Sequence, residues 1–388
     1  MNKIKIYTFI IAAILLCCSS CEKDGIIPSN QFNNTLSFED NSFQHIKNDT
    51  YQSVIDSYIK KGIIGTSIYV KDNNGIWIGA GGKADILSNI DVDKGNQFMI
   101  ASITKVFTAT VLFSLVDNGI LSIDDNISEW IPSSIANNIE NANEATIADL
   151  LSHKSGIADY YTTKFEMARY NTEHNYWVQE DILKYVYGKE ASFPVGQKYS
   201  YSNTNFLLLG MIIENASNMT LKDAYDENIF LPLELENAYY DTGRDAASTS
   251  LISGYYNLYG NGFILSDFLY KDELSTGDGG IIINPQDLGR FFDELMQGNL
   301  LSQASLMKMQ DWFDIEGNRK NGFGLEYFEN EHGISYGHTG GADGFTSVAH
   351  YYPNEDITVI ILLNFTPSDD LFDTTLDFIS DIKDVAFE

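Results

Sequence analysis

Cysteine is scarce in this chain and is absent from most of it. Only three of the 388 residues are cysteine, and Cys17, Cys18 and Cys21 all lie in the first 21 positions. Residues 22–388 therefore contain no group that could form a disulfide bond or act as a thiol nucleophile. Catalysis by cysteine is excluded for this part of the chain.

Basic residues are also few. The chain has 24 lysines and arginines against 54 aspartates and glutamates, so its formal net charge is −30. Nucleic acids and anionic membrane surfaces are bound by clusters of Lys and Arg, and this charge argues against both modes of binding. It is compatible with amine-bearing partners such as peptide stems, although a soluble acidic surface is the simpler interpretation.

The usual metal and phosphate motifs are missing as well. None of the six histidines lies in H-E-x-x-H or another compact ligand spacing. Gly79–Lys83 is glycine-rich but lacks the flanking residues of a phosphate-binding loop. We therefore expect no metal and no cofactor.

The apolar run near the start, Ile6–Leu16, is too short for a membrane-spanning helix, which needs about 20 residues. Lys3 and Lys5 precede it and small residues follow it, as in an export signal. We interpret residues 1–20 as a lipoprotein signal peptide, Cys21 as the lipidated residue of a bacterial envelope protein, and residues 21–45 as a polar tether. A folded domain over residues 46–388 would then be held near a membrane outside the cytoplasm.

Three short strings carry the chemistry. In order they are Ser102–Lys105 (S-I-T-K), Tyr201–Asn203 (Y-S-N) and His338–Gly340 (H-T-G). Together they supply a hydroxyl nucleophile, an amine and a phenol as candidate bases, and a glycine-containing edge for a substrate. Each alone is uninformative, because Ser305–Lys308 also fits S-x-x-K and Tyr255–Asn257 also fits Y-x-N.

The context of the first string favours Ser102. Apolar residues recur at helical spacing from Ile103 to Leu115, and Asn118-Gly119 is a plausible stop, so Ser102 is predicted to open a helix. Serine and lysine three residues apart share a helix face, and apolar surroundings would lower the lysine pKa. Tyr201 follows a Pro-Gly break and can act as a base only beside a cation such as Lys105.

The three strings resemble the motifs of the serine β-lactamase and penicillin-binding superfamily, in the branch of class C β-lactamases, D-alanyl-D-alanine carboxypeptidases and related esterases. Several companion segments agree with this resemblance, which runs from about residue 50 to the C-terminus. These segments are Leu121–Asp125, Leu150–Gly156, Phe193–Gly196 and His338–Phe345.

The resemblance implies a role for each matched residue. Ser102 would be acylated, Lys105 and Tyr201 would share the work of general base, and Asn203 would bind Lys105 and a substrate amide. The backbone N–H groups of Ser102 and Gly341 would form the oxyanion hole. His338, Thr339 and Gly340 would bind substrate.

His338 stands where many β-lactamases have lysine. Histidine has a reference pKa of about 6.5, so its attraction for a substrate carboxylate depends on pH. This argues mildly against a dedicated β-lactamase and leaves room for esters and for peptides without a carboxylate there.

The ends of the chain are β-patterned and the middle is helical. Residues 66–70 with 76–80, and 346–352 with 357–363, predict two hairpins, and residues 371–385 predict a closing helix. We therefore expect an α/β fold, with an antiparallel sheet flanked by helices and a mostly helical subdomain over about 120–270. The resemblance implies the same architecture, with the active site between the two parts.

Three functions remain open. The favoured one is a D-alanyl-D-alanine carboxypeptidase-like serine hydrolase acting on cell-wall peptides or related small peptides and esters. The second is a β-lactamase or esterase, and the third is an envelope lipoprotein that binds ligands without turnover. The expected partners are a small peptide, ester or β-lactam substrate and a membrane reached through the lipid anchor.

Overall fold

A computed structural model describes residues 35–171, 177–240, 251–257, 262, 264–265, 276–315 and 319–388. The predicted signal peptide and Cys21 lie outside these residues. Within these ranges the chain contains no helix with the length and apolar character needed to cross a membrane. The same residues bring together no group of three or more His, Cys, Asp or Glu that would hold a metal ion.

The two predicted hairpins form the middle of a large antiparallel sheet. β1 (Gly65–Asp72) pairs with β2 (Gly75–Asp85), and β13 (Phe345–Tyr352) pairs with β14 (Ile357–Leu363). β1 also pairs with β14, which joins the two ends of the described chain. Within the described residues the sheet has nine strands in the order β3-β2-β1-β14-β13-β12-β11-β10-β9. The remaining strands are β3 (Ile90–Asp91), β12 (Gly333–Ala342), β11 (Glu326–Asn330), β10 (Lys320–Asn321) and β9 (Phe313–Asp314).

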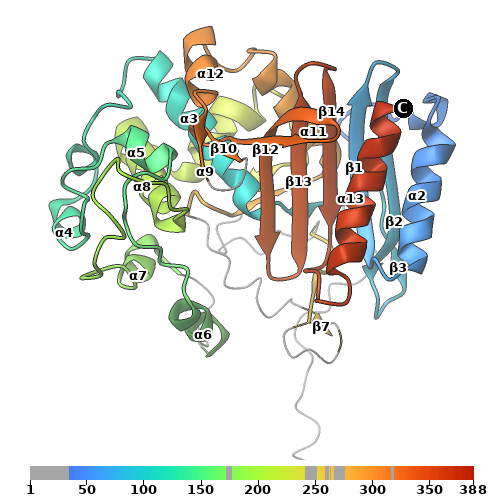
Figure 1. The fold of residues 1–388 in the computed structure, drawn as a ribbon, viewed down its shortest axis with the longest axis horizontal. Helices are drawn as coiled ribbons and strands as arrows, with labels where there is room; N and C mark the ends of the chain where they lie inside the picture. The colour runs from blue at the N-terminus through green and yellow to red at the C-terminus, as the bar shows by residue number, and fades with distance from the viewer. Residues whose placement is uncertain are drawn as a thin grey trace, which may run out of the picture. The chain divides into compact units, whose positions relative to one another are not determined.

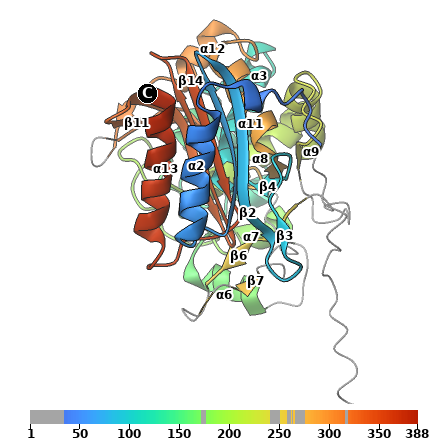
Figure 2. The same ribbon diagram turned by 90° about the vertical axis from the view of Figure 1, so that its right-hand side faces the viewer.

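Helices cover both faces of this sheet, so β1, β13 and β14 are buried on both sides. On one face α2 (Asn48–Lys60) packs beside α13 (Phe372–Phe387), the predicted closing helix. On the other face α11 (Pro285–Met296) contacts β1, β13 and β14. Figures 1 and 2 show the sheet between these two helical layers, and each layer has its own buried apolar cluster.

The helical part lies beside the β12 end of the sheet (Figure 1). Its centre is α3 (Thr104–Asp117) packed against α8 (Asn203–Ser217). The other α-helices are α4 (Ser133–Ala136), α5 (Ile147–Leu151), α6 (Thr163–Asn171), α7 (Gln179–Leu183), α9 (Leu221–Tyr225) and α12 (Gln303–Met309). The short helical turns are η2 (Ser42–Gln44), η3 (Ala101–Ile103), η4 (Ile127–Glu129) and η5 (Asp226–Phe230).

Short strands complete the described chain. β8 (Ile281–Ile283) pairs with β4 (Phe98–Met99) and β5 (Tyr239–Tyr240), and β6 (Tyr255–Tyr256) pairs with β7 (Ile264–Leu265). The predicted α/β class, with an antiparallel sheet flanked by helices, is confirmed.

The end of the predicted tether differs from expectation. Residues 35–45 contact the folded body: the backbone N–H of Phe38 donates to Gln286, and Asp40 pairs with Lys94. His45 Nε2 lies 3.0 Å from Asp72 Oδ1. Polar composition suggested a loose segment, but these polar side chains are hydrogen-bond partners of the body.

Candidate active site

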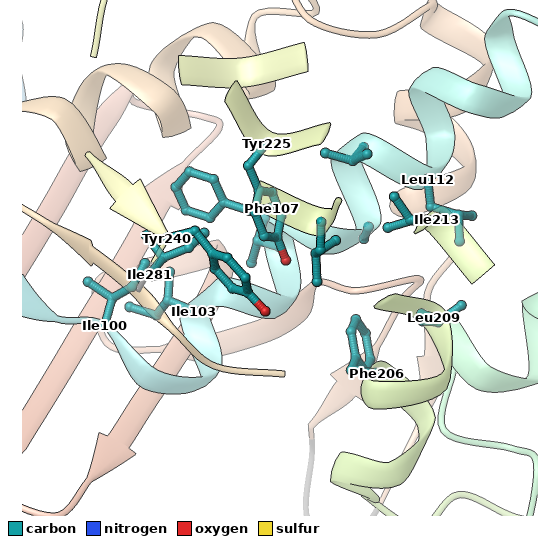
Figure 3. Close-up of a cluster of buried hydrophobic side chains, with 14 of the residues drawn as sticks. Ile100, Ile103, Phe107, Leu112, Phe206, Leu209, Ile213, Tyr225, Tyr240 and Ile281 are labelled. Atoms are coloured by element: carbon teal, nitrogen blue, oxygen red, sulfur yellow. The ribbon is translucent and has the colours of Figure 1, made fainter. Parts of the chain in front are cut away.

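Ser102 lies in η3, two residues before α3 begins, so it sits in a 3₁₀ turn that leads into the predicted helix. Its neighbour Ala101 has φ of +47°, a left-handed conformation that is unusual for a residue with a Cβ. Buried Ile100 and Ile103 fix the turn in the core, as Figure 3 shows beside Ile281. The turn thus holds the Ser102 hydroxyl at the start of a nearly fully buried helix.

Lys105 is completely buried one helical turn after Ser102. Its Nζ lies 3.0 Å from Ser102 Oγ, 3.0 Å from Asn203 Oδ1 and 2.9 Å from the backbone oxygen of Asp278. Burial lowers the pKa of Lys105 to about 8, although nearby carboxylates, Asp278 foremost, oppose that shift. The free amine therefore forms near pH 8, well below the pH at which an exposed lysine would lose its proton.

Tyr201 approaches from the loop before α8, and its hydroxyl donates to Ser102 Oγ at 2.9 Å. Its ring packs against the buried His153, with centroids 4.5 Å apart. We expected Lys105 to stabilise a phenolate, but burial raises the pKa of Tyr201 well above 10. The hydrogen bond with Ser102 opposes this rise in the pKa, and nearby carboxylates add to the rise. In this geometry Tyr201 is a protonated donor.

Asn203 is the first residue of α8, and Asp159 accepts two hydrogen bonds from it. The Asn203 side-chain amide donates to Asp159 Oδ2 at 3.2 Å, and its backbone N–H donates to Asp159 Oδ1 at 3.1 Å. Because the Asn203 nitrogen is used in this way, its oxygen faces Lys105. Asp159 is absent from the site residues predicted from sequence, although it lies three residues after the recognised Leu150–Gly156 segment.

Asp278 is a second residue that sequence reasoning missed. It lies in the loop before β8, and its carboxylate accepts hydrogen bonds from the hydroxyls of Tyr160 (2.7 Å) and Thr276 (2.5 Å). No signal available in a single sequence placed this loop next to Lys105.

The third string lies on β12. β11 pairs with β12 from Gly333 to Gly337, so the edge from His338 to Ala342 extends beyond that pairing. Thr339 and Gly341 are exposed. A side chain at Gly340 would place a Cβ 2.2 Å from the Ile100 oxygen, so glycine lets β12 pass directly beside the Ser102 turn. We expected glycine at position 340 to let a substrate approach. In the structure, glycine is needed there because β12 packs against Ile100, and the open space lies over Gly341 instead.

His338 is buried beside the Tyr201 ring, with centroids 6.4 Å apart. Burial lowers the pKa of His338 below 6.5, and the positive charge of Lys105 contributes to the shift, although Glu326 opposes it. His338 is therefore neutral at physiological pH.

The competing match to the first motif has a different environment. Ser305 Oγ donates to Asp117 at 2.6 Å, and Lys308 pairs with Asp311 at 2.8 Å. The hydroxyl and the amine thus serve separate structural contacts on α12. The competing Y-x-N match at Tyr255–Asn257 begins in β6, where the Tyr255 hydroxyl accepts from the Ile86 N–H.

The chain is similar in sequence to several known proteins. A family model described as Beta-lactamase matches residues 50–382. The chain is 29% identical over 304 residues to penicillin-binding protein 4* of Bacillus subtilis (strain 168), covering 73% of this chain. It is 24% identical over 331 residues to protein flp of Staphylococcus aureus (strain MRSA252), covering 82% of this chain. Both matches span 64% of the relative's own length.

Two solved structures have a similar fold. A D-stereospecific amidohydrolase from Streptomyces sp. matches with a TM-score of 0.69 and 26% identity, covering 82% of this chain and 94% of that one. A penicillin-binding protein from Bacillus halodurans matches with a TM-score of 0.72 and 23% identity, covering 85% of this chain and 98% of that one.

Proposed function

The chain belongs to the Beta-lactamase family, whose members are serine hydrolases, and on that premise we propose that it hydrolyses small acyl substrates through an acyl-enzyme on Ser102. One observation carries the proposal. Ser102 Oγ lies 3.0 Å from Lys105 Nζ and 2.9 Å from the Tyr201 hydroxyl. A nucleophile with an amine and a phenol both within hydrogen-bonding distance is the arrangement that acyl transfer requires.

The contacts of Lys105 favour it as the first base. Asn203 Oδ1 and the Asp278 backbone oxygen can only accept hydrogen bonds, so they take both N–H groups of a neutral Lys105 amine. Its lone pair then points at the Ser102 hydroxyl. Because Tyr201 is protonated, it donates to Ser102 Oγ and stabilises the negative charge that develops there.

After the attack, the proton on Lys105 must reach the leaving group. In this proposal Tyr201 gives its proton to the leaving group, and the proton that Lys105 took from Ser102 then passes from the ammonium to the Tyr201 phenolate, so both groups return to their starting forms. The backbone N–H groups of Ser102 and Gly341 would bind the oxyanion, and the edge of β12 at Thr339 would align the substrate. The close approach at Gly340 supports this arrangement, because it brings β12 beside the Ser102 turn.

We propose cell-wall peptides or related small peptides and esters as substrates, in the manner of a D-alanyl-D-alanine carboxypeptidase. β-Lactamase or esterase activity is the alternative, and binding without turnover is the alternative of another class.

A second candidate, hydrolysis of amides or esters without a free carboxylate, is favoured by the two pKa shifts. Lys105 loses its proton near pH 8, whereas His338 gains one only below pH 6.5. When the base is ready, His338 is uncharged and offers a carboxylate no ion pair. The likeness to an amidohydrolase at 26% identity agrees with this candidate.

The pH dependence of substrate binding tests the role of His338. A carboxylate-bearing peptide should bind about fivefold more tightly at pH 5.5 than at pH 8, because only the protonated ring attracts it. The measurement is KM across this range, with an uncharged ester of similar size as the control. A KM that does not change with pH, and is the same in His338→Gln, would remove this role from His338.

We also propose that the chain is lipid-anchored at Cys21 in the bacterial cell envelope. The signal-like pattern before Cys21 supports this. Mass spectrometry of the membrane fraction would detect the lipid, and a Cys21→Ser variant should move the protein into the soluble extracytoplasmic fraction.

The experiment for the main proposal is incubation with a fluorescent penicillin and with an ester reporter, using Ser102→Ala as the blank. A stable adduct on Ser102 supports a carboxypeptidase-like enzyme, and rapid loss of the adduct supports a β-lactamase. Ester turnover without labelling supports an esterase. If neither an adduct nor turnover is detected, the proposal is contradicted, and ligand binding without turnover is the remaining function.

A further inference from the structure

We propose that Asp278 is a positioning residue for Lys105: its backbone oxygen orients the amine, and its buried carboxylate sets the pH above which Ser102 becomes a nucleophile. This inference rests on the proposed function, because it concerns the base of that reaction. The direct contact is the 2.9 Å hydrogen bond from Lys105 Nζ to the Asp278 oxygen.

The loop that carries Asp278 is held tightly against the two helices of the site. The Gly277 oxygen accepts a hydrogen bond from Thr108 of α3 at 2.5 Å. A Cβ on Gly277, whose φ is +92°, would lie 2.7 Å from the Phe206 oxygen of α8, and a Cβ on Gly210 would lie 2.9 Å from the Thr276 oxygen. The two glycines therefore allow close backbone contact, which fixes the Asp278 oxygen relative to α3 and α8.

The carboxylate of Asp278 is also fixed. The residue is 7% exposed, and the hydroxyls of Tyr160 and Thr276 donate one hydrogen bond to each carboxylate oxygen. These two contacts hold the carboxylate in one orientation. A negative charge held near a buried amine favours the ammonium form, which delays the appearance of the free base as pH rises.

Other titratable groups face Lys105 from every side, so the contribution of Asp278 must be separated from theirs. Asp278 opposes the lowering of the Lys105 pKa more than the other carboxylates do. The groups are Asp278 from the loop before β8, Asp159 and His153 from the segments between α5 and α6, Tyr201 from the loop before α8, Glu326 from β11 and His338 from β12.

The chain offers a matched control in Asp293 of α11. Asp293 is 8% exposed, and its carboxylate also accepts from one tyrosine and one threonine, Tyr69 at 2.7 Å and Thr358 at 2.5 Å. These two partners belong to β1 and β14, away from the residues that surround Ser102. Replacing either aspartate by asparagine removes a buried charge that a tyrosine and a threonine hydroxyl contact. Asp293 differs in one respect, because Lys71 Nζ lies 3.6 Å from its Oδ1.

The experiment measures the rate at which a fluorophosphonate labels Ser102 between pH 5.5 and pH 9.5, in the wild type, Asp278→Asn and Asp293→Asn. Asparagine can keep both hydroxyl partners because hydroxyls accept as well as donate. We expect the acidic limb of the Asp278→Asn profile to move down by roughly one pH unit, so that labelling at pH 6.5 gains up to about tenfold relative to its plateau. Asp293→Asn should keep the wild-type limb.

The outcomes are distinct. A limb that stays in place in Asp278→Asn, or that moves equally in Asp293→Asn, overturns the inference while the proposed function stands. A uniform loss of rate at all pH values, with an unmoved limb, means that Asp278 has only a structural role and also overturns it. A wild type that is not labelled at any pH overturns the proposed function and this inference with it. Asp278→Ser removes the same charge and replaces Asp278→Asn if circular dichroism shows that the latter does not fold.

Discussion

Two lysines, Lys105 on α3 and Lys383 on α13, are both buried, but their surroundings are very different. They are 0% and 6% exposed, and burial lowers the pKa of each to about 8. Lys105 contacts Ser102, Asn203 and Asp278, whereas the contact of Lys383 Nζ is His350 Nδ1 at 3.2 Å. Lys383 lies on the opposite face of the sheet from α11.

The difference shows that a lowered pKa alone does not make a catalytic base. The Lys105 amine has a fixed orientation. Two acceptors bind its hydrogens when it is neutral, so its lone pair faces the Ser102 hydroxyl. The Lys383 amine contacts His350, another basic side chain, and this contact does not orient its lone pair toward a nucleophile. Three substitutions test this comparison.

The largest effect is expected from methionine at each lysine. Lys105→Met should lower fluorophosphonate labelling of Ser102 by roughly 10⁴-fold, because no other amine faces that hydroxyl within the described part of the chain. In Lys383→Met the rate of Ser102 labelling should stay within about threefold of the wild-type rate. A large loss in both variants would show that the two lysines do not differ in this way.

A smaller effect is expected from Asp159→Asn. The NH₂ group of the new asparagine would face the NH₂ group of Asn203, and two donors cannot hydrogen-bond to each other. The Asn203 amide would therefore rotate and present its nitrogen, instead of its oxygen, to Lys105. We expect kcat/KM for the ester reporter to fall roughly 10- to 100-fold. Asp287→Asn is the control, because that carboxylate also accepts a backbone N–H, from Asn237, on the α11 side. Unchanged kcat/KM in Asp159→Asn would mean that Asp159 does not set the orientation of the Asn203 amide.

The smallest effect concerns stability. Lys383 has a lower pKa in the folded than in the unfolded chain, so its charge destabilises the fold below about pH 8, and this cost disappears as pH rises toward about 10.4. Lys383→Met should therefore raise the free energy of unfolding by roughly 1–3 kcal/mol at pH 7 and by less at pH 10, measured by urea denaturation. An equal gain at both values would show that charge is not the cause.

Much of the fold was predictable because alternation and turn residues act locally. The hairpins at 66–80 and 346–363 and the closing helix are present as β1–β2, β13–β14 and α13. The contacts among Ser102, Lys105, Tyr201 and Asn203 also agree with the motifs, since side chains in a fixed order on a known scaffold meet predictably.

The rest depended on tertiary placement. Asp278 is an ordinary loop residue in the sequence, and only the close backbone contact between Gly210 and Gly277 brings it to Lys105. The Tyr201 pKa was expected to fall beside a cation, but burial and neighbouring carboxylates have the larger effect and raise it. Neither burial nor the direction of a loop can be read from local pattern.

Gly340 sets how closely β12 can approach the Ser102 turn. The β12 backbone touches the Ile100 oxygen there, with no room for even a methyl group. Alanine at that position would act as a wedge, pushing the strand away from the serine without removing any reactive group. The distance between β12 and the Ser102 turn thus depends on the absence of a side chain at position 340.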